Sequence, residues 1–304
     1  MEISKDSFEK VPQNEKVLNE IVRPSETYWQ DSWRRLKEDK LAMLGLILVI
    51  AVTIIAFIGP LFSHNNYYVQ DFKIANQRPS DVHWFGTDQF GRDLFIRVLY
   101  GARISLIVGY VASFLELVIG IIYGGISGYI GGIVDNIMMR IVDVLLSIPM
   151  MLYVILLIVI LKPGLKTIII AFAISYWVSM ARMVRGEVLR LKEQEFVLAA
   201  KTLGASSKRI IFRHLIPNCM GPIIVTLTMS IPSAIFTEAF LSYIGLGISV
   251  PKASLGTLCN DAMQGYLIYP YQMFFPALAI CITILGFNFL GDGLRDALDP
   301  KMRK

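Results

Sequence analysis

Two glutamates, Glu116 and Glu238, stand inside long stretches of apolar residues. A carboxylate is costly to bury among apolar side chains, so each is a candidate for a functional role. Either could contact an amine in a passage that the chain lines. Alternatively, neighbouring backbone or hydroxyl groups satisfy it by hydrogen bonding, and Thr237 and Ser242 are near Glu238 in sequence. We favour the second interpretation for both glutamates and keep the first as a hypothesis.

Nucleophilic catalysis finds little support in the sequence. The segment Gly125-Ile-Ser-Gly128 is similar to the GxSG motif of rhomboid-type intramembrane proteases. A serine nucleophile needs a base within hydrogen-bond reach. The three histidines are His64, His83 and His214, and none lies in an apolar stretch. The glycine-rich region 124–132 is better explained as a tight turn, and we predict no catalytic residue.

Phosphate and metal chemistry are also missing from the chain. A P-loop places glycine directly before its phosphate-binding lysine, and no lysine here follows a glycine. The chain is therefore not expected to hydrolyse ATP through a P-loop, and any energy that it uses must come from a partner or an ion gradient. Cys219, Cys259 and Cys281 have no CxxC spacing and are expected to be small buried hydrophobic residues. We predict no metal site and no cofactor bound by this chain.

The composition indicates what surrounds the apolar stretches. Of 304 residues, 55% are hydrophobic and 17% charged, and the mean hydropathy is +0.56. Soluble domains average roughly 45–50% and 25%. The chain is therefore predicted to be an all-α integral membrane protein in a lipid bilayer. No basic patch on a soluble face indicates a nucleic-acid partner.

Six stretches are long and apolar enough to cross a membrane. They cover residues 41–63, 104–126, 141–161, 167–184, 219–245 and 273–290. An even number of spans places both termini on one side. By this division 21 of the 29 lysines and arginines lie on that side and 8 on the other, so both termini are predicted to be cytoplasmic.

The predicted organisation follows from these spans. A cytoplasmic tail covers 1–40, the first transmembrane helix 41–63 and an extracytoplasmic loop 64–100. A transmembrane domain covers 101–292 with a cytoplasmic loop at 185–218, and a cytoplasmic C-terminus covers 293–304.

The tail carries a helical pattern of its own. Trp29, Trp33 and Leu36 follow the i, i+4, i+7 spacing of one helix face, and Ser25 could cap such a helix. Two arrangements fit this pattern. The segment is an amphipathic helix on the inner membrane surface, or it simply continues into the first span.

The cytoplasmic loop between the fourth and fifth spans contains a predicted helical hairpin. Residues 193–203 are good helix formers, and Gly204 fits a left-handed helix cap. Ser206 or Ser207 can then cap a second short helix that runs to Pro217. Alanines at 199 and 200 leave one face bare, which allows another protein to approach closely. On structural grounds alone, this is a hairpin on the membrane surface.

This hairpin resembles a known family. Ala199-Ala200-x-x-x-Gly204, followed by Pro217, is similar to the EAA loop of membrane subunits of bacterial ABC importers. The resemblance implies a coupling helix that docks into a groove of an ATPase subunit. Leu198 stands where that family's motif has glutamate. The implied coupling residues are Leu198, Ala199, Ala200, Gly204, Ala205 and Pro217.

Other segments resemble the peptide/nickel branch of that family. The segment 86–93, Gly-Thr-Asp-Gln-Phe-Gly-Arg-Asp, looks like the approach to the second span in this branch, and the segments 238–247 and 292–300 resemble its later parts. The outer-loop motif residues are Gly86, Asp88, Gly91, Arg92 and Asp93. The extra N-terminal span with its long outer loop resembles the C-type subunit of oligopeptide and dipeptide importers.

The resemblance implies a transport subunit and no enzyme. It implies a permease in the bacterial cell membrane that forms half of a translocation path for peptides. Oligopeptides are the first candidate substrate. The implied partners are a homologous second permease, two cytoplasmic P-loop ATPase subunits that bind ATP and Mg²⁺, and an extracytoplasmic binding protein. Glu116 and Glu238 are the candidates for the path. Two alternatives stay open: an ion-coupled carrier that acts alone, and a nickel or other-substrate permease of the same family.

The charge asymmetry predicts the result of a labelling experiment. Cysteines introduced at 70–80 should react with an impermeant thiol reagent in intact cells, whereas cysteines at 205–210 should react only after the cells are opened. The reverse pattern would overturn the predicted orientation.

Overall fold

The computed structural model of the chain describes residues 27–62, 66–248 and 251–299. Most of the predicted cytoplasmic tail, with Ser25, lies outside these ranges, as does His64. Within the described residues the fold is helical, and the sole β pairing there is an isolated bridge between Thr87 and Asp93.

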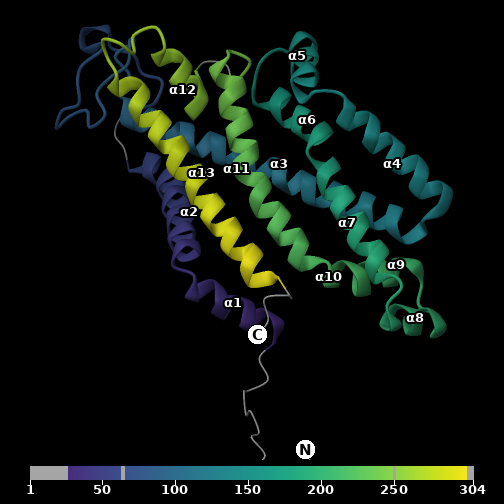
Figure 1. The fold of residues 1–304 in the computed structure, drawn as a ribbon. Coiled ribbons are helices and arrows are strands. Elements are labelled where there is room, and N and C mark those ends of the chain that lie inside the picture. Colours follow the sequence, from purple (N-terminus) through teal and green to yellow (C-terminus); the bar gives the residue numbers. More distant parts are fainter. Residues whose placement is uncertain (1–26, 63–65, 249–250, 300–304) are drawn as a thin grey trace, which may run out of the picture.

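The helices follow one another along the chain with short connections (Figure 1). They are α1 (Tyr28–Glu38), α2 (Lys40–Ile58), α3 (Leu94–Ile130), α4 (Gly132–Ser147), α5 (Met150–Leu161), α6 (Leu165–Ser175), α7 (Trp177–Leu191), α8 (Glu195–Thr202), α9 (Ser207–Arg209), a π-helical segment (Ile210–Leu215), α10 (Ile216–Asn218), α11 (Met220–Tyr243), α12 (Leu255–Ala262) and α13 (Tyr271–Leu298). Two short 3₁₀ turns, Gly59–Leu61 and Phe72–Ile74, lie between α2 and α3.

Five helices of the described chain are long and apolar enough to cross a membrane, and the third predicted span is bent. The five cover Lys40–Leu61, Leu94–Ile130, Leu165–Leu191, Met220–Tyr243 and Tyr271–Leu298. The stretch 141–161, predicted as one span, instead contributes to α4 and α5, which meet at an angle of 80°. Ile148 precedes Pro149 and is extended (φ −95°, ψ 120°), because a proline disfavours helical geometry in the residue before it.

The two ends of the molecule carry different parts of the chain. Figure 1 shows α1, the end of α13 and the hairpin α8–α9 at one end, and α12 with the 66–93 segment at the other. The Tyr28 hydroxyl donates a hydrogen bond to the carbonyl of Leu298 at 2.8 Å. The first and last described helices thus meet at the same end as the hairpin.

The tail helix α1 is separate from the first span. Asp39 has an extended backbone (φ −84°, ψ 108°), and its carboxylate accepts hydrogen bonds from the first amides of α2. The alternative of one continuous helix is therefore wrong. Thr27 caps α1 in a capping box with Gln30. Leu36 is buried beside α13, whereas Trp33, which the spacing places on the same face, is about half exposed. The predicted face is therefore only partly covered by the rest of the protein.

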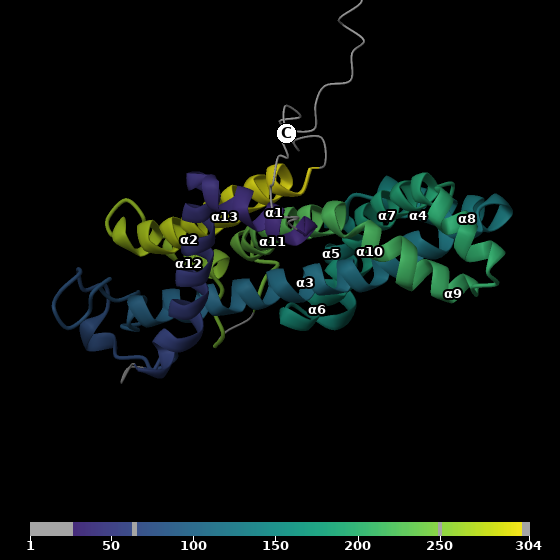
Figure 2. The ribbon, with the colours of Figure 1, turned by 90° about the horizontal axis from the view of Figure 1, so that it is seen from below.

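Glycines on α3 let this helix pack closely against α7. A methyl group added at Gly120 would lie 2.5 Å from the Met180 side chain, and one added at Gly124 would lie 2.3 Å from the carbonyl of Ala181. Small residues at this spacing allow membrane helices to approach by van der Waals contact. Figure 2 shows α3 extending along the molecule from the 66–93 segment toward α7 and the hairpin.

The predicted turn over 124–132 is correspondingly shorter than expected. Gly124, Gly125 and Gly128 are helical residues of α3. The chain turns at Gly131 and Gly132, where φ is 72° and 58°.

The α3–α7 contact predicts opposite effects for two alanine substitutions. Gly124→Ala should lower the free energy of unfolding by about 1–3 kcal/mol, because a backbone carbonyl would have to move. Gly186→Ala on α7 meets nothing within 4 Å and should be neutral or stabilising by up to about 1 kcal/mol. Thermal unfolding of the purified protein measures both. Equal effects of the two substitutions would contradict the packing account.

Candidate functional site

The outer-loop motif forms a compact turn before α3. Gly86 and Gly91 have φ values of 76° and 71°, which favour glycine. The Asp88 carboxylate accepts hydrogen bonds from the amides of Phe90 and Arg92, at 2.9 and 3.0 Å. The Asp93 carboxylate caps α3 by accepting from the amide of Ile96 at 3.0 Å. The structure therefore brings all five predicted motif residues together.

A buried network of charges holds this turn against α12. The Arg92 Nε lies 2.6 Å from an Asp88 oxygen, and Arg97 bridges Asp88 and Asp261 at 3.2 and 3.1 Å. The Arg97 side chain is buried, with 1% of its surface exposed. Burial raises the pKa of Asp261, although Arg97 and Arg92 oppose this shift. Sequence reasoning missed Asp261, because it lies more than 160 residues from its partner in α3.

Glu238 belongs to the helix packing. Its carboxylate accepts hydrogen bonds from the hydroxyls of Ser105 on α3 and Ser242 on α11, both at 2.7 Å. The side chain is fully buried. The predicted Ser242 partner is thus confirmed, and Glu238 is not among the residues that line a described cavity of this structure.

Glu116 has a different environment. It lines a cavity of about 480 Å³ between α3, the α4–α5 bend, α6, α7 and α11. One carboxylate oxygen, Oε2, is buried without a hydrogen-bond partner. Hydroxyl-bearing residues line the same space, namely Tyr153, Ser175, Tyr176, Ser179, Thr226, Ser230 and Ser233. This cavity therefore combines one carboxylate with uncharged walls, in which hydroxyl groups alternate with apolar side chains such as those of Leu145 and Met229.

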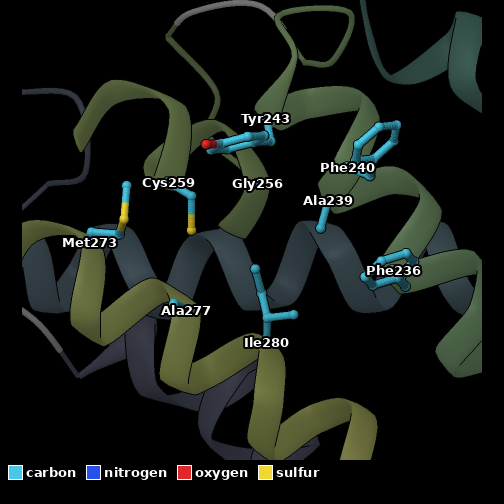
Figure 3. A pocket seen from close by; sticks show the side chains of 9 residues that line it. All are labelled: Phe236, Ala239, Phe240, Tyr243, Gly256, Cys259, Met273, Ala277 and Ile280. Carbon is cyan, nitrogen blue, oxygen red and sulfur yellow. The ribbon is translucent and has the colours of Figure 1, made fainter. Parts of the chain in front are cut away.

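A second cavity, of about 290 Å³, lies between α11, α12 and α13 and is lined mainly by apolar side chains. Figure 3 shows side chains from all three helices around it, including Phe240, Cys259 and Ile280. This cavity could hold an apolar group, and it has few hydrogen-bonding groups that could orient a polar ligand.

The hairpin forms as predicted. Gly204 has a φ of 79° after α8, and the Ser206 hydroxyl caps α9 by accepting from the amide of Arg209. The continuation to Pro217 is largely π-helical (Ile210–Leu215). Among the described residues no group of three or more His, Cys, Asp or Glu side chains could hold a metal ion.

The two alanines of the hairpin do not share one exposed face. Ala199 is exposed, but Ala200 and Ala205 are half-buried against the protein's own core. The expectation of one bare alanine face is therefore wrong for Ala200, because α8 packs against the π-helical segment Ile210–Leu215 and Ala200 contacts the core cluster there. The exposed positions of the hairpin instead include larger apolar side chains, those of Phe196 (41% exposed), Leu198 (50%) and Leu203 (87%). Sequence reasoning missed Phe196 and Leu203, although apolar residues in a charged segment were a usable signal.

Comparison with known proteins assigns the family. Residues 117–304 match the model of the binding-protein-dependent transport system inner membrane component, and residues 27–79 match the N-terminal TM domain of oligopeptide transport permease C. The chain belongs to this inner membrane component family. The members of this family are permease subunits. Family membership and the apolar helices of the chain together identify it as a multi-pass protein of the bacterial cell membrane.

Relatives of this permease family cover nearly the whole chain. The oligopeptide transport system permease protein OppC of Bacillus subtilis (strain 168) is 51% identical over 302 residues, 99% of each chain. The dipeptide transport system permease protein DppC of the same organism is 50% identical over 308 residues, 98% of this chain and 96% of that one. The glutathione transport system permease protein GsiD of Escherichia coli O157:H7 is 42% identical, covering 94% and 96%.

Solved structures support the permease fold. A chain of the MetNI methionine ABC transporter in inward-facing conformations superposes with a TM-score of 0.55 at 20% identity. The match covers 68% of this chain and 96% of that chain. The helical architecture is therefore that of an ABC transporter permease.

The buried charge network predicts a large effect of Arg97→Met. Removal of one partner from a buried ion pair leaves an uncompensated charge and typically costs about 3–5 kcal/mol. Lys73→Met removes a positive charge from an exposed side chain of the same outer segment and should change stability by less than about 0.5 kcal/mol. Denaturant unfolding of the purified protein compares the two. Equal stability of the two variants would show that the network contributes little.

Proposed function

We propose that this chain is one of two membrane subunits of an ATP-driven importer for peptides, most simply oligopeptides. The names of the most similar relatives support the substrate class. The family description, which names binding-protein-dependent transport, supports an extracytoplasmic binding protein as a partner. A homologous second permease would complete the path, and two ATPase subunits would bind ATP and Mg²⁺.

The exposed apolar side chains of the hairpin carry this proposal. Outside the membrane spans, three large apolar side chains on one short segment are costly to leave in water. The hairpin also lies at the same end of the molecule as α1 and the last turn of α13. The charge asymmetry of the sequence assigns this end to the cytoplasm. An ATPase surface with a complementary apolar groove is the partner that would cover Phe196, Leu198 and Leu203.

The connections of the hairpin support a route for coupling. Three residues, 192–194, join α7 to α8, and α10 leads into α11. Both α7 and α11 contribute to the cavity, through Ser179 and Ser230 for example. One core cluster packs Val188 of α7 with Val197 of α8 and Leu215 of the π-helical segment. A displacement of the hairpin by closing ATPases would therefore shift two walls of the cavity together.

The proposal predicts that hairpin variants lose ATPase coupling. Leu203→Glu places a charge in the proposed apolar contact, and Gly204→Val forces a β-branched residue toward a φ of 79°. Each should lower ATPase association, and with it ATP-dependent uptake, by at least roughly tenfold. Co-purification of the ATPase subunits and uptake into proteoliposomes measure these effects.

The matched control is Lys208→Ala, an exposed charge on the same hairpin, which should leave both measurements near wild type. We use Leu203 because Ala200 also packs inside the hairpin, so a charge at Ala200 would disturb the fold itself. Normal uptake by Leu203→Glu and Gly204→Val at wild-type protein levels would leave the segment as a plain surface hairpin.

A further inference from the structure

Glu116 is a buried carboxylate with unused hydrogen-bonding capacity. Its side chain is 2% exposed, and Oε2 has no hydrogen-bond partner. Glu238 provides the comparison within the same protein, since serines on α3 and α11 satisfy both of its oxygens. Two glutamates in apolar helices thus differ in two respects: Glu116 has an oxygen without a hydrogen-bond partner, and it faces a cavity.

No positive charge of the described chain neutralises Glu116. Among the described residues its carboxylate forms no ion pair, and Glu116 is the sole charged side chain in the wall of this cavity. Two arginines of α7 form ion pairs with other carboxylates: Arg182 pairs with Asp143, and Arg185 pairs with Asp135. An unpaired carboxylate in a membrane-embedded site is costly unless a positive group enters the site.

The walls of the cavity suit a positively charged ligand that also carries polar and apolar groups. A volume of about 480 Å³ is in the range of small-ligand sites. The hydroxyls of Ser175 and Ser233 donate to carbonyls of their own helices, so toward a ligand they can accept hydrogen bonds, and they impose no charge of their own. Such walls tolerate many peptide side chains, whereas the single carboxylate recognises one feature that unmodified peptides share, the N-terminal ammonium group.

We infer that Glu116 is the residue that receives the N-terminal ammonium group of a peptide as it passes through this cavity. The inference rests on the proposed peptide transport and adds the residue that selects for charge. Ser230, beside Glu116 in the wall, contributes a neutral hydrogen-bonding group. The second permease would supply the opposite wall.

A labelling experiment tests the charge of the cavity independently of transport. Ser233 lines the cavity and is exposed, so Ser233→Cys is introduced after replacement of Cys219, Cys259 and Cys281 by alanine. The reaction rates of a cationic and an anionic methanethiosulfonate reagent are then compared in the purified complex. Glu116→Gln should lower the cationic-to-anionic rate ratio by about tenfold, because it removes the local negative charge.

The matched control is Glu187→Gln, the same change at a partly exposed glutamate of α7 that pairs with Arg190 outside the cavity. It should leave the rate ratio unchanged. An unchanged ratio in Glu116→Gln would overturn the inference, since it would mean that the carboxylate is neutral or is paired with a residue of the second permease.

Uptake by the complete transporter then tests the ammonium group itself. Glu116→Gln should raise the KM for a peptide with a free N-terminus by about tenfold, and Glu116→Asp should restore part of the loss. A wild-type KM in Glu116→Gln would overturn the assignment to the ammonium group. If the wild-type complex takes up no peptide with ATP present, the proposed function fails, whereas the labelling ratio still decides whether the cavity attracts cations.

Discussion

The close approach of α3 to α7 is the contact on which the rest of the structure depends. Gly120, Gly124 and Gly128 lie one turn apart and leave a strip of α3 without side chains, against which the backbone of α7 packs. Within a bilayer the lipid tails are as apolar as the helices, so association depends on van der Waals contact of this kind. A side chain at any of these positions would push α7 outward, and with it the hairpin that follows α7.

Three kinds of interaction stabilise three levels of the molecule. At the end with α12, buried charges centred on Arg97 fix the outer segment to the helices. In the middle, glycine contacts set the distance between α3 and α7, and Glu116 lies one turn before Gly120. At the other end, an apolar cluster joins the hairpin to α7 and α11. The cavity and the hairpin thus share helices, and this connection gives the proposed coupling a physical route.

Local patterns in the sequence predicted more of the fold than of the site. Apolar length revealed the spans, and Gly204 revealed the hairpin, because span length and cap geometry are properties of short segments. The bend at Pro149 had a local signal but depends on how α4 and α5 pack. The orientation of Ala200 depends on the packing of α8 against the π-helical segment that follows it in the chain. Glu116 and Glu238 look alike in the sequence, and a serine 133 residues away from Glu238 makes the difference.

The central claim is that this chain moves peptides only as part of an ATP-driven complex. The most direct test is uptake of a labelled oligopeptide into proteoliposomes that contain this chain, a second permease and the ATPase subunits, with the binding protein outside and ATP inside. The account predicts uptake that stops when ATP, the binding protein or any subunit is omitted. Peptide accumulation by this chain alone, driven by an ion gradient without ATP, would contradict it.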